Sequence, residues 1–203
     1  MASEIDVVNM ALSRIGANTI SSVDDPTNEA RLAKLELDQS KSSLLRQANW
    51  NFATKWQVMY VTADVVVFPD FKYIFSLPVD YIRVQAMKYP TSTVASGELR
   101  SIDRWNITGR YLGTDVESPL MRYTNNAGIG LWDDMAIEAL VWRMSANLSS
   151  TLSRSETTRA YAAQQFMMAY QLAQNVDGKE KVLDRVTTDG RLLSARRGGS
   201  SVW

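Results

Sequence analysis

The sequence predicts an α+β fold: a four-helix bundle, an antiparallel β domain inserted between helices two and three, and an extended C-terminal tail. Apolar residues recur at helical spacing near both ends of the chain. β-branched and aromatic residues concentrate between these ends, where prolines also recur. The last residues are rich in glycine, serine and arginine. We therefore expect a helical bundle from residues 1–51 and 131–182, a β insertion at 52–130, and a flexible tail at 183–203.

The first helix is expected from about residue 4 to residue 15. Ser3 and Asp6 have the spacing of a capping box, with Asp in place of the usual Glu. Gly16 follows the helix directly and suits a left-handed C-terminal cap. The apolar stripe of this helix consists of Ile5, Val8, Leu12 and Ile15.

The second helix is expected to begin near Pro26, which is a favourable first-turn residue, with Asp25 as its cap. Small and medium apolar side chains on one face indicate packing inside a bundle. The residues of this face are Ala30, Ala33, Leu37, Leu44 and Ala48.

Trp50 and Phe52 lie where the helical pattern gives way to an extended, aromatic-rich pattern. Side chains two residues apart share one face of a strand. We therefore expect both aromatic side chains to be core residues, buried between the helices and the β insertion.

The β insertion is expected to contain short strands, with a mobile loop tip at residues 91–98. The expected strands span residues 56–61, 73–77, 81–89, 105–112 and 120–123. This region is more aromatic than one small sheet face requires, and interfaces are rich in such residues. The alternative is that these aromatic side chains simply cover the bundle. The residues concerned are Trp56, Tyr60, Phe68, Phe71 and Tyr73.

Helical periodicity returns at Leu131, and Asp133 and Asp134 favour a helix N-terminus nearby. The third helix presents one apolar face, made of Ile137, Leu140, Met144 and Leu148. The fourth helix is expected to follow Ser155. Its apolar seam has coiled-coil-like spacing and consists of Ala162, Phe166, Ala169, Ala173 and Val176.

Several classes of enzyme are excluded by composition. The chain has no Cys and no His, which removes disulfides, Cys- or His-ligated zinc sites, thiol nucleophiles and Ser-His-Asp arrangements. Gly128-Ile129-Gly130 lacks the third glycine of a nucleotide-binding loop. Asp133 and Asp134 are neighbours on a helix start, where side chains point apart. We expect no catalytic residue, no cofactor and no metal.

Charge and hydropathy limit the partners. Lys and Arg number 22, as do Asp and Glu, so the formal net charge is zero and gives no global attraction to nucleic acid. No apolar run approaches the ~18 residues of a membrane-spanning helix. The N-terminus lacks the apolar region of a signal peptide. We expect a protein made in the cytoplasm that has no membrane contact.

The order of these features resembles the head-to-tail adaptors (connectors) of tailed bacteriophages, including the tail tubular protein A group. The matching segments are NMALSRIG at 9–16, ISSVDD at 20–25, LL at 44–45 leading into WNFA at 50–53, and FSLPVDYIRV at 75–84. Phe75 stands where the family usually has Tyr. The helix pair that begins near Leu131 also fits in position.

The resemblance implies a structural protein of the virion, placed at the head-tail junction and made in the host cytoplasm. Members form an assembly ring, twelve-fold in many cases, that docks beneath the portal protein. Their helical part lines a channel through which DNA passes during ejection, without sequence-specific binding. Their β insertion faces the tail nozzle or tube protein, so the exposed aromatic side chains of this region are predicted to make tail or inter-subunit contacts.

The tail at 190–203 has three arginines, no acidic side chain and an apolar tip. We expect it to be disordered in the free protein and to bind the portal when the assembly ring forms. A loose terminus without a role remains open, as does contact with DNA. The second function considered is accordingly a nucleic-acid-binding accessory protein of the virion. The predicted portal-binding residues are Arg191, Leu192, Leu193, Arg196, Arg197, Val202 and Trp203.

Overall fold

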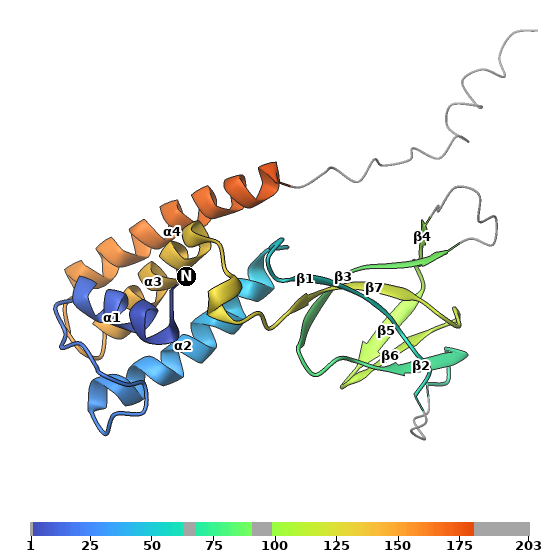
Figure 1. The fold of residues 1–203 in the computed structure, drawn as a ribbon, viewed down its shortest axis with the longest axis horizontal. Helices are drawn as coiled ribbons and strands as arrows, with labels where there is room; N and C mark the ends of the chain where they lie inside the picture. The colour runs from blue at the N-terminus through green and yellow to red at the C-terminus, as the bar shows by residue number, and fades with distance from the viewer. Residues whose placement is uncertain (1, 63–67, 91–98, 181–203) are drawn as a thin grey trace, which may run out of the picture.

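The computed structural model describes residues 2–62, 68–90 and 99–180. It shows a mixed α+β protein in which helices gather at one end and antiparallel strands at the other (Figure 1). Two helices precede the strands along the chain and two follow them. The described helices are α1 (Glu4–Arg14), α2 (Asn28–Gln47), α3 (Asp134–Ser149) and α4 (Glu156–Lys179), with a short 3-10 helix η1 (Ile129–Leu131).

The ends of α1 form as the sequence predicts. The Ser3 hydroxyl accepts a hydrogen bond from the Asp6 backbone N–H, and the Asp6 carboxylate accepts one from the Ser3 N–H at 2.9 Å. Gly16 adopts a φ of +71°, which a side chain would oppose, immediately after the C-cap residue Ile15. The predicted capping box and glycine stop are therefore confirmed.

The start of α2 differs from the prediction. Thr27 is the cap, and its side chain accepts from the Ala30 N–H. Asp25 instead accepts from the N–H groups of Ser21 and Ser22, at 2.9 Å each, and so stabilises the preceding loop. Both residue types can cap a helix, and the local loop decides which one does so.

Helical periodicity is expected from Leu131, whereas α3 itself begins three residues later, at the N-terminus predicted for Asp133 and Asp134. Leu131 ends the 3-10 helix η1 and is 66% exposed. Asp133 caps α3 by accepting from the Met135 N–H at 2.9 Å. Asp134 is the first residue of α3, so both carboxylates lie at the positive end of a helix, as predicted.

Helix α3 lies at the centre of the helical region and packs against the other three helices. Its predicted apolar face is buried, together with small residues such as Ala136 and Ala139. The inner face of α4 is partly buried: Ala162 and Ala173 are 1% exposed, while Phe166 packs against the core from its edge. Small side chains at these positions allow the helices to approach closely.

Trp50 belongs to the helical core, where it is 1% exposed and its Nε1–H donates to the Leu44 carbonyl at 2.9 Å. Phe52 is only half-buried. The two aromatic rings stack with centroids 5.6 Å apart, and Phe52 lies 5.2 Å from Trp132. Both residues precede the first strand, so the expectation that they share a strand face is wrong. A turn after α2 brings the rings together.

The strands form two antiparallel sheets. One sheet has the order β1-β7-β3-β4, and the other has the order β2-β6-β5. The first sheet comprises β1 (Thr54–Val58), β7 (Leu120–Asn125), β3 (Tyr81–Pro90) and β4 (Leu99–Ser101). The second comprises β2 (Tyr73–Ser76), β6 (Tyr111–Thr114) and β5 (Trp105–Thr108).

Two strand predictions require correction. The strand expected at 105–112 is a hairpin, because Gly109 takes a φ of +61° and the chain reverses between Thr108 and Tyr111. The first strand ends at Val58, and Val61 makes only an isolated bridge to Phe75. The short strand β4 was not predicted.

A second apolar core lies between the two sheets. Phe75 of β2 and Leu112 of β6 face Met87 of β3 and Met121 of β7, and all four are at most 3% exposed. Further members of this cluster are Met59, Leu77, Ile102 and Tyr123. Each sheet therefore buries one face against the other, and the other face of the β1-β7-β3-β4 sheet carries exposed side chains.

Specific hydrogen bonds join the helical region to the strands. The Asn51 backbone N–H donates to the Asp177 carboxylate, and the Asn51 side-chain amide donates to the Asp177 carbonyl, both at 2.7 Å. Arg46 of α2 donates to the Ile82 carbonyl of β3 at 3.1 Å. The segment just before the first strand is therefore held to the last turns of α4.

Candidate assembly surfaces

The outer side of α4 is uncharged and carries large exposed apolar side chains, interspersed with the exposed polar side chains of Gln164, Gln171, Gln174 and Asn175. Tyr161, Met167, Met168 and Leu172 are each 51–56% exposed, and we call these four residues the α4 face. No charged residue occurs in residues 160–176, between Arg159 and Asp177. A surface helix of a globular protein normally carries charged side chains on its outer side. The sequence analysis found only the inner seam of this helix; the missed signal was the absence of charge.

A cationic-aromatic cluster adjoins the α4 face and joins three helices. The Arg14 guanidinium of α1 lies 3.9 Å above the Trp142 ring of α3. Trp142 in turn meets Tyr161 of α4 edge-on, with centroids 5.8 Å apart. Arginine, tryptophan and tyrosine are the residue types most enriched at interaction hot spots.

The Arg14 guanidinium is partly desolvated. Burial lowers the pKa of Arg14, and the nearby Glu138 and Tyr161 act in the opposite direction. Its Nη1 atom is buried and has no hydrogen-bond partner among the described residues. A buried donor without an acceptor costs free energy, and because Arg14 as a whole is only half-buried, a partner's carboxylate could approach the accessible part of its side chain.

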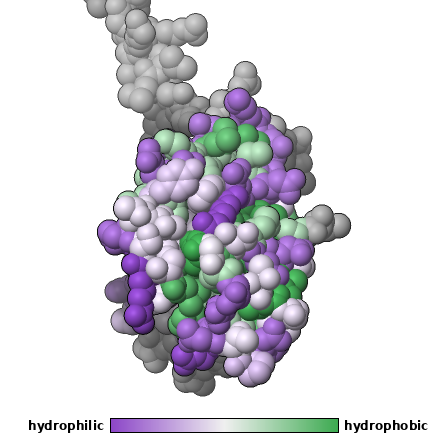
Figure 2. Space-filling model, turned by 90° about the vertical axis from the view of Figure 1, so that its left-hand side faces the viewer, coloured by the Kyte–Doolittle hydropathy of each residue, from purple (hydrophilic) through white to green (hydrophobic). Residues whose placement is uncertain are grey.

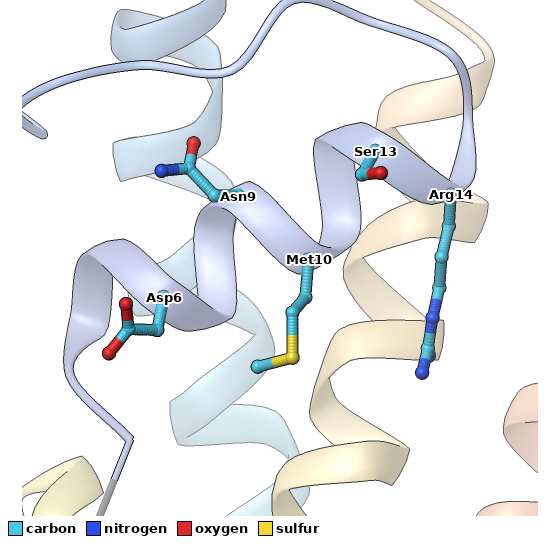
Figure 3. Close-up of a pocket in the computed structure, with 5 residues that line it drawn as sticks. All are labelled: Asp6, Asn9, Met10, Ser13 and Arg14. Atoms are coloured by element: carbon cyan, nitrogen blue, oxygen red, sulfur yellow. The ribbon is translucent and has the colours of Figure 1, made fainter.

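Arg14 also lines an open pocket of about 480 Å³ on α1 (Figure 3). Figure 3 shows Met10 and Arg14 extending from the same side of α1, while Asn9 points elsewhere. Asn9 is structural, because its side-chain amide donates to the Ile20 carbonyl and accepts from the Ile20 N–H, both at 2.9 Å. Met10 is 39% exposed and extends the apolar surface beside Arg14.

The outer face of the four-stranded sheet is organised around Trp56, which is 44% exposed. Arg122 of β7 and Lys88 of β3 lie 5.5 and 5.6 Å from its ring centroid. Gln85 accepts from Arg122 Nε at 3.0 Å and donates to Thr54 and Thr124. This network holds the Arg122 cation in place beside the indole on one sheet face.

The other predicted contact aromatics differ in exposure. Tyr60 is 79% exposed, whereas Phe68, Phe71 and Tyr73 are half-buried. Phe68 and Phe71 pack over Gly113, where an added Cβ would lie 2.7 Å from Phe71 Cδ2 and 2.9 Å from Phe68 Cδ1. Phe68 and Phe71 therefore cover the smaller sheet, and Trp56 and Tyr60 remain accessible to a partner.

The largest pKa shift occurs at Tyr123. Burial, together with its hydrogen bond to Asp80, raises the pKa of Tyr123 to about 12. Burial alone would raise the pKa of Asp80, but hydrogen bonds from Lys55 and Tyr123 outweigh it and lower that pKa. A phenol with a raised pKa is a poor acid or base at neutral pH. This group of three side chains therefore stabilises the sheet.

The described ranges contain no group of three or more His, Cys, Asp or Glu residues that could hold a metal ion. Within the same ranges, no helix is long and apolar enough to cross a membrane.

Figure 2 shows the helical end of the molecule, where hydrophobic surface forms patches separated by hydrophilic side chains. Such patches suit contacts with other proteins.

The predicted portal-binding residues lie outside the described residues, and so does the predicted loop tip at 91–98. Their placement therefore adds nothing to the site. The residues concerned are Arg191, Leu192, Leu193, Arg196, Arg197, Val202 and Trp203.

Comparison with known protein families places this chain beside one described family. Residues 5–140 match a family model described as tail tubular protein. This range includes α1 except its first residue, α2, all the described strands and the start of α3. No curated protein matches the chain.

Proposed function

The chain belongs to the tail tubular protein family, and from this premise we propose that it is a head-to-tail adaptor of a bacteriophage. The family gives the protein a structural, non-enzymatic role in the phage tail and places it in the virion. In the proposed role, several copies form a ring beneath the portal protein, joining capsid to tail and lining the channel for DNA ejection.

The α4 face is the observation that carries this proposal. Four large apolar side chains are each 51–56% exposed on a helix surface without charge, and such a surface is stabilised when another protein covers it. An enzyme would need a constellation of reactive groups. An assembly protein needs accessible apolar surface, which this chain has on both its helices and its larger sheet.

The proposal divides the chain into three functional parts. Residues 1–51 and 131–182 form the helical part, which faces the portal and neighbouring copies. Residues 52–130 form the β insertion, which faces the tail nozzle or tube protein. Residues 183–203 form the portal-binding tail. Two separate apolar cores, one among the helices and one between the sheets, support the first division.

A nucleic-acid-binding accessory protein is the second candidate. Trp56, held beside Arg122 and Lys88, has the composition of a base-stacking platform. A formal net charge of zero weighs against this function, because non-specific binding to nucleic acid depends on excess positive charge.

The proposal is tested by measuring the native mass of the purified protein alone and mixed with purified portal. We expect a monomer alone and a defined complex of several copies on each portal. Binding to DNA that falls steeply with salt, without any complex on the portal, would favour the accessory function. A monomer under every condition would contradict the adaptor function.

The portal-binding tail has its own test. Truncation after Asp189 removes the arginines and the apolar tip while it leaves all described residues intact. We expect normal folding and at least about tenfold weaker binding to portal, since charged and apolar contacts are lost together. Undiminished assembly by the truncated chain would exclude this role for the tail.

A further inference from the structure

The α4 face and the Arg14 cluster form one surface that is suited to a partner of a particular chemistry. Tyr161 belongs to both. Its ring makes an edge-to-face contact with Trp142, and the Arg14 guanidinium lies over the ring of the same Trp142. The surface therefore offers one cation at its edge and, beside it, uncharged side chains in which large apolar residues are interspersed with exposed glutamines such as Gln164 and Gln171. A partner surface that fits it would present a carboxylate next to an apolar side chain, for example along one side of a helix.

The outer stripe of α2 has this complementary composition. Leu35 is 66% exposed, the largest exposure of any apolar side chain on α2. Asp38 follows one helical turn later on the same exposed side, where Lys34, four residues before it, already interacts with its charge, and Ser42 extends the stripe without charge. We call Leu35, Asp38 and Ser42 the α2 stripe.

The two surfaces lie on opposite sides of the helical region. Figure 1 shows α4 along one edge and α2 along the other, and α3 packs against both. Two different surfaces on opposite sides of a subunit produce head-to-tail association, which closes into a ring when the rotation permits. A self-complementary surface would instead give a two-fold dimer.

We propose that the α4 face and Arg14 of one copy bind the α2 stripe of the next copy, with Arg14 pairing with the neighbour's Asp38. The carboxylate neutralises a guanidinium that is stacked on Trp142 and partly buried. Leu35 packs among Tyr161, Met168 and Leu172, so apolar surface on both copies leaves water together. This interface deepens the proposed function and rests on it, since it describes how the assembly ring is held together.

Charge reversal tests the pairing. Arg14→Glu and Asp38→Arg are made singly and together, and copies bound per portal are counted by native mass. We expect each single variant to reduce complete assembly rings at least about tenfold. The double variant should recover most of this loss, because the reversed charges attract again. Arg159→Glu is the matched control: it reverses a charge on α4 outside the α4 face and should leave assembly unchanged.

A second variant guards against misfolding of Arg14→Glu, whose parent side chain packs on Trp142. Met168→Asp alters only an exposed side chain and should keep the wild-type unfolding midpoint while it blocks ring completion. Wild-type assembly by Met168→Asp and by Asp38→Arg would overturn the interface, and so would a double variant without recovery.

The outcomes separate this inference from the adaptor function. If the single variants bind one copy per portal and stop there, contacts between copies are lost and the inference stands. If the variants fail to bind even a first copy, the surface faces the portal, which overturns the inference while the adaptor function survives. If the wild-type chain forms no complex with portal, the adaptor function and the proposed interface are both contradicted.

Discussion

The helical and sheet regions of this protein expose apolar side chains in different ways. On α4, the exposed side chains Met167, Met168 and Leu172 have no charged neighbour on their own helix in residues 160–176. On the larger sheet, exposed Trp56 lies beside Arg122 and Lys88. The first surface suits an extensive, largely dry contact, and the second suits a smaller contact with a polar rim.

The difference teaches that exposure alone does not define an interface. Phe68 and Phe71 looked equivalent to Trp56 in the sequence, yet they pack over Gly113 and stabilise the smaller sheet. Trp50 and Trp56 lie six positions apart, and one is a core residue while the other is a surface residue. Substitutions can therefore separate side chains that stabilise the fold from side chains available to partners.

The largest expected effect is on the pair Trp50 and Trp56. Trp50→Ala should lower the free energy of unfolding by about 3–5 kcal/mol, because it empties a fully buried site and removes the hydrogen bond to Leu44. Trp56→Ala should lower it by less than about 1 kcal/mol, since that side chain is 44% exposed. Chemical denaturation measures both. Equal losses in the free energy of unfolding would contradict the assignment of Trp50 to the core and Trp56 to the surface.

Gly113→Ala sharpens the assignment of Phe68 and Phe71. A methyl group at position 113 would lie 2.7 Å from Phe71 and 2.9 Å from Phe68, so both rings must shift. We expect a loss of about 2 kcal/mol, as for other overpacked sites. An unchanged thermal midpoint would show that these rings move freely and are available for contacts.

Asn51→Ala tests the connection between the two regions. It removes the side-chain hydrogen bond to the Asp177 carbonyl but keeps the backbone bond to the Asp177 carboxylate. The expected loss is about 1 kcal/mol. Hydrogen exchange should show faster opening at the end of α4 and the start of β1, and exchange that stays the same there would contradict the connection.

Tyr123→Phe should change the response of stability to alkaline pH. The folded protein raises the pKa of Tyr123 from its ordinary 10 to about 12. The neutral phenol therefore contributes stability that is complete below about pH 10 and is lost as the pH rises toward 12. The free energy of unfolding of the Phe variant should be about 1 kcal/mol lower at neutral pH, and it should not show this decline at alkaline pH. Denaturation at a series of pH values measures this, and an equal loss of stability between pH 10 and 12 in both proteins would contradict the role of Tyr123.

Local patterns predicted the helices well because their signals lie close together in the sequence. The Ser3 and Asp6 cap, the Gly16 stop and the buried face of α3 all depend on residues within a few turns. The cap of α2 was misassigned, since Asp25 and Thr27 are both capping types. Asp25 accepts a hydrogen bond from the preceding loop at Ser21, and Thr27 caps the helix.

The remaining features depend on contacts that sequence spacing does not show. The hairpin at Gly109 was read as one strand because a lone Gly, the first residue of its two-residue loop, is a weaker turn signal than an Asn-Gly or Asp-Gly pair. Arg14 and Trp142 are distant in the chain, so their stacking could not be foreseen from either residue. The α4 face had a sequence signal, namely the absence of charge at residues 160–176.

The central claim is that several copies of this chain form a ring on the portal and that the α4 face is covered by a neighbouring copy. Electron microscopy of the purified protein bound to purified portal tests it most directly. The account predicts a closed ring in which α4 of each copy packs against α2 of the next. Single copies scattered on the portal, or a ring in which α4 remains exposed to solvent, would contradict it.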